Sequence, residues 1–90
     1  MARRKHPFVN LEAAIFFCDI DKKILAKMLN MNYGSLLSKL NGDKEFTLKQ
    51  MEKVRDLVIR EYKGDSLEIK DKLGKLDYLF YKEVSDGEKL

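Results

Sequence analysis

The stretch from Ile20 to Gly42, IDKKILAKMLNMNYGSLLSKLNG, constrains the fold of this chain more than any other segment. Asp21 can cap the start of a helix by accepting a hydrogen bond from an orphan backbone N–H. An apolar stripe at helical spacing follows, made up of Ile24, Leu25, Met28 and Leu29. Asn30 is placed to end this helix, because Asn tolerates the left-handed backbone conformation that commonly follows a helix.

A second short helix is predicted directly after the first. Asn32 can cap it, and Asn41-Gly42 can end it. Leu36 and Leu40 give it an apolar stripe at i, i+4. Only residues 30–32 separate the two helices, which is too few for much besides a sharp corner. Many proteins use two short helices joined in this way to place the second one in the major groove of DNA.

Three segments resemble the helix-turn-helix family of phage repressors and Cro proteins, the XRE-like group. Residues 21–29, DKKILAKML, resemble the first helix of that motif, and residues 32–42, NYGSLLSKLNG, resemble the second helix and its exit turn. The segment from Phe46 to Met51, FTLKQM, resembles the start of the family's fourth helix. The resemblance covers about residues 8–62 and implies a compact, four-helix, all-α DNA-binding domain.

The resemblance also implies which residues read bases: Tyr33, Gly34, Leu37 and Ser38. Tyr33 could pack on a thymine methyl or bond a phosphate, and Ser38 could donate to or accept from a base edge. Gly34 would let the backbone come close, whereas Leu37 could contact a thymine methyl or belong to the core. This face has no Arg, Gln or Asn apart from Asn32 at the cap. We therefore expect either modest intrinsic specificity or a copy that has lost DNA binding.

Groups that could hold phosphates are more plentiful. Lys22 resembles the family position that grips a phosphate beside the groove, aided by free backbone N–H groups at the helix start. Further candidates on the same surface are Lys23, Asn32, Lys39, Asn41 and Lys44. Residues 1–45 carry eight basic and five acidic side chains, whereas residues 46–90 carry ten of each. The excess positive charge thus lies where phosphate contacts would need it, although a mixed, solvated surface is the alternative.

Both ends of the chain are expected to lie outside the folded domain. Residues 1–7, MARRKHP, are predicted to be a mobile arm whose Arg3, Arg4 and Lys5 could contact phosphates or enter a minor groove. The alternative is an end that only adds solubility. Residues 85–90 are predicted to be a polar tail.

The segment before the two short helices predicts another helix, from Leu11 to Asp19, capped by Asn10. One stripe faces the core and contains Leu11, Ala14, Ile15 and Cys18. Phe16 and Phe17 fall outside this stripe, so the helix is apolar over much of its circumference. We expect those two rings to be covered by another segment or to contact a partner.

Two further elements follow in the sequence. Thr47 and Gln50 are spaced as a capping box for a helix that runs to about Tyr62. Its apolar stripe contains Leu48, Met51, Val54, Leu57 and Val58. The last element, residues 66–84, is predicted to be one helix capped by Ser66, although residues 76–81 are also rich in strand-favouring aromatics.

The last helix has a core-facing stripe formed by Ile69, Leu73, Leu76 and Phe80. We expect it to cover Phe16 and Phe17 or to pair with its twin in a dimer. The residues proposed for a dimer or partner surface are Phe16, Phe17, Leu76 and Phe80.

Several classes of function find no support in the sequence. With one Cys and one His, the chain offers no disulfide, metal-ligand cluster or nucleophile–base pair, so we expect neither an enzyme nor a cofactor. No apolar run is long enough to span a membrane, and no signal peptide is evident, so a cytoplasmic protein is expected.

The prediction is therefore a DNA-binding transcriptional regulator of phage or mobile-element type that occupies its operator on double-stranded DNA as a homodimer. The alternative is a protein-binding module on the same fold, such as an antitoxin or a phage-encoded inhibitor. That alternative is motivated by the poor base-reading face and by the surplus apolar surface.

Overall fold

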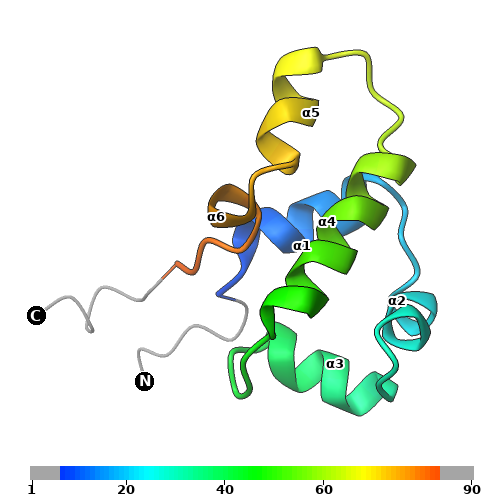
Figure 1. Cartoon of the computed structure of the whole chain (residues 1–90), viewed down its shortest axis with the longest axis vertical. Helices are drawn as coiled ribbons and strands as arrows, with labels where there is room; N and C mark the ends of the chain where they lie inside the picture. The colour runs from blue at the N-terminus through cyan, green and yellow to red at the C-terminus, as the bar shows by residue number, and fades with distance from the viewer. Residues whose placement is uncertain (1–6, 84–90) are drawn as a thin grey trace, which may run out of the picture.

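The computed structural model describes residues 7–83, and this part of the chain is all α-helical, without a β-strand (Figure 1). Six helices follow one another along it: α1 (Val9–Phe17), α2 (Lys22–Met28), α3 (Tyr33–Leu40), α4 (Leu48–Glu61), α5 (Leu67–Leu73) and α6 (Leu76–Leu79). The predicted all-α class is thus confirmed for residues 7–83.

Four of the predicted helix starts are made by the side chains expected to make them. Asp21 Oδ1 accepts from the Lys23 amide at 2.8 Å, and Asn32 Oδ1 accepts from the Ser35 amide at 2.7 Å. At the start of α4, the Thr47 and Gln50 side chains and amides bond reciprocally. At the start of α5, Ser66 Oγ accepts from the Ile69 amide at 3.2 Å. Each cap satisfies donors that the helix itself leaves unpaired.

The corner between α2 and α3 is closed by the backbone. Asn30 has φ of 61°, the left-handed conformation predicted for it, and the Met31 amide returns to the Ala26 carbonyl at 3.0 Å. At the other end of α3, Asn41 is the C-cap and Gly42 has φ of 89°. Two short helices joined by a tight turn are therefore present where the sequence predicts them, and they pack against each other.

The core is filled by one apolar face from each of α1 to α4, closed by single residues of α5 and α6. The buried side chains from the first three helices are Leu11, Ala14, Ile15, Leu25, Ala26, Leu36 and Leu40, with Cys18 and Leu29 directly after α1 and α2. Val54, Leu57 and Val58 from α4, with Phe8, Leu73 and Leu79, complete it. The stripe predicted for α2 is only half correct, because Ile24 and Met28 are exposed.

The start of α1 differs from the prediction. The helix begins at Val9, its N-cap is Phe8, and Phe8 makes no side-chain cap hydrogen bond. Asn10 lies inside the first turn, where its Nδ2 donates to the Tyr78 carbonyl at 2.9 Å. The predicted Asn10 cap was wrong because burial of the Phe8 ring extends the helix backwards, which leaves Asn10 to join α1 to α6.

The C-terminal element is not the single helix predicted for residues 66–84. Gly74 ends α5 as its C-cap, Lys75 is extended, and α6 starts at Leu76. This break lets Leu79 reach the core, where it is fully buried against α1 and α4. The strand alternative for residues 76–81 is wrong as well, because residues 76–79 are helical.

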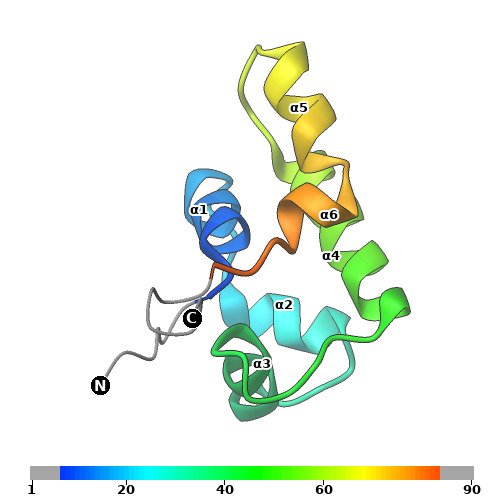
Figure 2. The same ribbon diagram turned by 90° about the vertical axis from the view of Figure 1, so that its left-hand side faces the viewer.

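Neither α5 nor α6 covers the two phenylalanines at the end of α1. Phe16 is 88% exposed and Phe17 is 61% exposed, and the Tyr62 ring lies 5.8 Å from the Phe17 ring between centroids. The hydrogen bond from Asn10 shows that α6 meets the opposite, N-terminal end of α1 (Figures 1 and 2). The expected cover for Phe16 and Phe17 was therefore wrong.

Candidate nucleic-acid interface

Helix α3 lies at one end of the molecule, and α5 lies at the opposite end in both views (Figures 1 and 2). Leu36 and Leu40 anchor α3 to the core, and the Asn32 cap sets its start. Because these anchors occupy one side of a helix of eight residues, its other side is left for solvent. The four predicted base-reading residues do not share this exposed side equally.

Tyr33 and Gly34, in the first turn of α3, are exposed, and 41% of Tyr33 is accessible. Leu37 is partly buried and packs against the core, so of its two predicted roles, contact with a thymine methyl or membership of the core, the structure supports the second. Ser38 is partly buried, and its carbonyl accepts from the Asp43 amide at 2.9 Å. The accessible part of the predicted reading face is therefore mainly its N-terminal turn.

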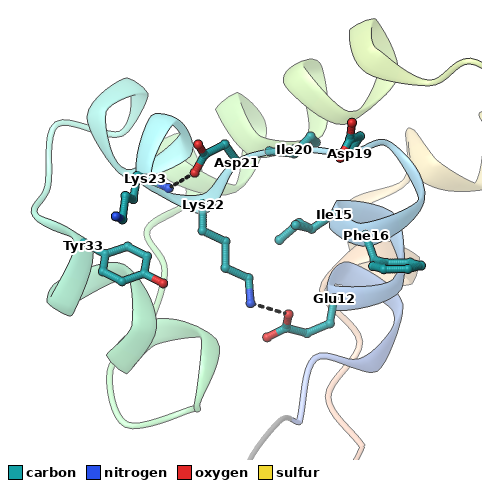
Figure 3. A pocket seen from close by; sticks show the side chains of 9 residues that line it. All are labelled: Glu12, Ile15, Phe16, Asp19, Ile20, Asp21, Lys22, Lys23 and Tyr33. Carbon is teal, nitrogen blue, oxygen red and sulfur yellow. Dashed lines mark hydrogen bonds and ion pairs between the residues drawn. The ribbon is translucent and has the colours of Figure 1, made fainter.

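Three of the predicted contact residues gather where α1, α2 and α3 meet. An open hollow of about 580 Å³ lies there, and its lining includes Glu12, Phe16, Asp19, Lys22, Lys23 and Tyr33. Lys23 Nζ lies 5.9 Å from the centre of the Tyr33 ring, within cation–π range. Figure 3 shows Lys22 reaching across the hollow to Glu12 on α1, with 3.0 Å between Nζ and Oε1.

Of the other predicted phosphate-binding residues, three lie at the C-terminal end of α3 and in the loop beyond it, namely Lys39, Asn41 and Lys44, whereas Asn32 is the N-cap of α3. Lys39 Nζ donates to the Glu45 carbonyl at 2.6 Å and lies 6.0 Å from the centre of the Phe46 ring, so it ties α3 to the loop. Asn41 and Lys44 are exposed. Asn32 uses its carbonyl oxygen in the cap, which leaves its amide group to donate.

The four residues predicted to form a dimer or partner surface do not form one surface. Phe80 is partly buried and packs edge-to-face with Phe8 and Phe46, at centroid distances of 6.0 and 5.2 Å. It therefore belongs to the core of the domain, near the start of α1. Phe16 and Phe17 lie at the other end of α1, and Leu76 is partly buried. The arm residues Arg3, Arg4 and Lys5 lie outside the described residues.

Glu12 is the residue of this region that sequence reasoning missed. Its charge looks like one of many on a solvated helix, and ten positions separate it from Lys22. Only the packing of α1 beside the start of α2 brings the two together. The local sequence contains no signal that pairs them.

The described residues offer little other chemistry. Residues 7–83 contain no group of three or more His, Cys, Asp or Glu side chains that could hold a metal ion. Burial raises the pKa of the Cys18 thiol, and Glu61 acts in the same direction, so the thiol is protonated at neutral pH and unsuited to nucleophilic attack. None of the helices between residues 7 and 83 is long and apolar enough to cross a membrane.

Comparison with known proteins adds no relative: no protein-family model, curated protein or solved structure matches this chain.

Proposed function

We propose that this protein binds double-stranded DNA through α3 and regulates transcription by occupying an operator, as phage repressors of the helix-turn-helix type do. The observation that carries the proposal is the arrangement around α3. Tyr33, in the exposed first turn of α3, lies beside Lys22 and Lys23 at the start of α2. Lys39 lies near the other end of α3, and Lys44 lies in the loop beyond it. An α-helix such as α3 is about 10–12 Å across with its side chains, which matches the width of about 12 Å of the major groove.

The position of Lys22 and Lys23 supports a role outside the helix that carries them. Both lie in the first turn of α2, where the helix dipole disfavours positive charge. Because helix stability does not explain lysines there, contact with an anion is the better account, and within the domain Glu12 already supplies one to Lys22. The phosphate backbone of DNA beside the groove is such an anion.

The base-reading contacts are few, which limits the specificity that direct readout can supply. With Leu37 packed against the core, Tyr33 and Ser38 are the side chains left to contact base edges. Each good bidentate contact contributes about 1–3 kcal/mol of discrimination, and neither residue makes such a contact. Binding as a homodimer to two half-sites about 34 Å apart, together with DNA shape, would supply the rest.

The first experiment is a mobility-shift assay on random-sequence duplex at two salt concentrations, followed by selection and sequencing of the bound fraction. We expect salt-sensitive binding that enriches a two-fold symmetric sequence. Replacing Tyr33 and Ser38 together by Ala is expected to abolish the enrichment while leaving salt-sensitive binding. Tyr78→Ala on α6 is the matched control, because its exposed fraction of 39% is close to that of Tyr33. Equal enrichment by both variants would refute the assignment of α3 as the reading helix.

A second candidate function is a protein-binding module, and the exposure of Phe16 favours it. A phenylalanine that is 88% exposed on a helix beside an open hollow is the kind of anchor that protein interfaces bury. Phe16→Ser separates the two functions. DNA binding should be unaffected by this change, whereas binding to a protein partner should be lost.

A further inference from the structure

From the contact between Glu12 and Lys22 we infer that Glu12 is an affinity-setting residue of the DNA interface, which holds Lys22 by standing in for a phosphate. The inference rests on the proposed function, because it concerns the same surface. On that surface Glu12 is a residue that opposes DNA binding. Glu12 thereby keeps the affinity for non-specific DNA low.

The geometry of the pair supports this role. Lys22 Nζ lies 3.0 Å from Glu12 Oε1, and the two side chains are only 31% and 23% exposed. A partly buried pair is screened less by salt than an open surface pair, so the ammonium is held more firmly. Figure 3 shows the Lys22 side chain extending from the start of α2 to Glu12, so that its charge is directed to α1.

The alternative partner of Lys22 is chemically similar to the one it has. A carboxylate and a phosphate both offer anionic oxygens to an ammonium group at about the same distance. DNA therefore has to displace Glu12, or Lys22 stays on Glu12 and contributes no phosphate contact. In either case the Glu12 carboxylate lowers the contribution of Lys22 to DNA binding in each protomer.

Lowering this contribution does not change discrimination between sequences. Phosphate contacts add the same free energy on every sequence, so they raise non-specific and specific binding together. Glu12 therefore lowers the affinity for every duplex by the same factor, and sequence preference is left to the base-reading side chains.

The test compares Glu12→Gln with the wild type on random-sequence duplex, at about 50 and about 200 mM salt. The released lysine is expected to tighten binding by up to about fivefold per protomer. It is also expected to steepen the slope of log K against log salt by up to about 0.9 per protomer. Asp19→Asn is the matched control: it removes one negative charge from the same hollow, and Asn suits the φ of 58° at that position.

A double-mutant cycle with Lys22→Gln decides whether Glu12 acts through Lys22. If it does, the gain in affinity from Glu12→Gln is smaller once Lys22 is gone, because no lysine is then released. An equal gain with and without Lys22, or an equal gain from Asp19→Asn, would overturn the inference in favour of general charge repulsion. Tight wild-type binding that Glu12→Gln leaves unchanged also overturns it, with the proposed function intact. If neither protein binds any duplex, the proposed function fails, and the inference fails with it. Thermal unfolding of each variant confirms that it is folded in the assay.

Discussion

Replacing Phe80 by Ala tests whether the C-terminal segment belongs to the domain core or forms a partner surface. The Phe80 ring is partly buried and packs edge-to-face on Phe8 and Phe46, with interplanar angles of 78° and 69°. Phe46 follows the exit loop of α3, so this cluster joins the C-terminal segment to the helix proposed to contact DNA. If the cluster is structural, Phe80→Ala destabilises the monomer.

The expected loss can be worked from these contacts. Truncating a fully buried Phe to Ala costs about 3–5 kcal/mol. Part of the Phe80 ring stays in solvent, so about 2 kcal/mol is a better figure, of which the two aromatic pairs contribute roughly half. For a domain of this size, such a loss lowers the melting temperature by about 8–16 °C.

Urea unfolding followed by far-UV circular dichroism measures the effect directly. Tyr81→Ala is the control, because the neighbouring Tyr81 is exposed and its truncation should change the free energy of unfolding by less than about 0.5 kcal/mol. An equally small change for Phe80→Ala, accompanied by loss of self-association, would refute the reasoning. Phe80 would then be a partner-surface residue, as the sequence alone suggested.

Four further predictions concern individual positions. Gly42→Ala should cost at least about 1 kcal/mol in urea unfolding, because its φ is 89° and a Cβ there would lie 3.1 Å from Pro7 Cγ. Gly34→Ala, inside α3 and without a close contact, should instead stabilise the protein by up to about 1 kcal/mol. Cys18, whose thiol pKa is raised by burial, should react with a thiol reagent far more slowly in the folded protein than in urea. Because its thiol ionises at lower pH when unfolded, this residue's contribution to stability is complete below about pH 8.5 and falls as pH rises above that value. Phe16→Ser should leave the melting temperature within a few degrees of the wild type, since the ring is almost fully exposed; a large drop would show that α1 needs it.

The parts of the fold that sequence reasoning predicted correctly are those encoded by neighbouring residues. Asp21, Asn32 and Thr47 cap helices because the donor that each satisfies is two or three residues away. Asn30 and Gly42 end helices through their own backbone preferences. Such signals act within one turn, so the rest of the chain need not be known.

The wrong predictions all depended on contacts distant in sequence. Asn is a residue type that often caps helices, but the helix begins one residue before Asn10 because Phe8 is buried. The Asn10 side-chain amide instead donates to the carbonyl of Tyr78, 68 positions away. The stripe from Ile69 to Phe80 has helical spacing throughout. However, the backbone becomes extended at Lys75, and this break brings Leu79 into the core. Spacing alone does not distinguish one long helix from two short ones joined by a turn.

The charged residues of the candidate interface also differ in whether the sequence alone could predict their contacts. The sequence identifies which lysines lie near α3, but the affinity of such a surface depends on which of them are already paired. Lys39 is bonded to the Glu45 carbonyl, six residues along the chain, whereas Lys22 is paired with Glu12 on another helix. The tertiary structure therefore lowers the number of cations ready to meet phosphates below the number that the sequence suggests. Since each phosphate contact adds about 0.9 to the salt slope, a measured slope smaller than the count of nearby lysines is the expected consequence of these internal pairs.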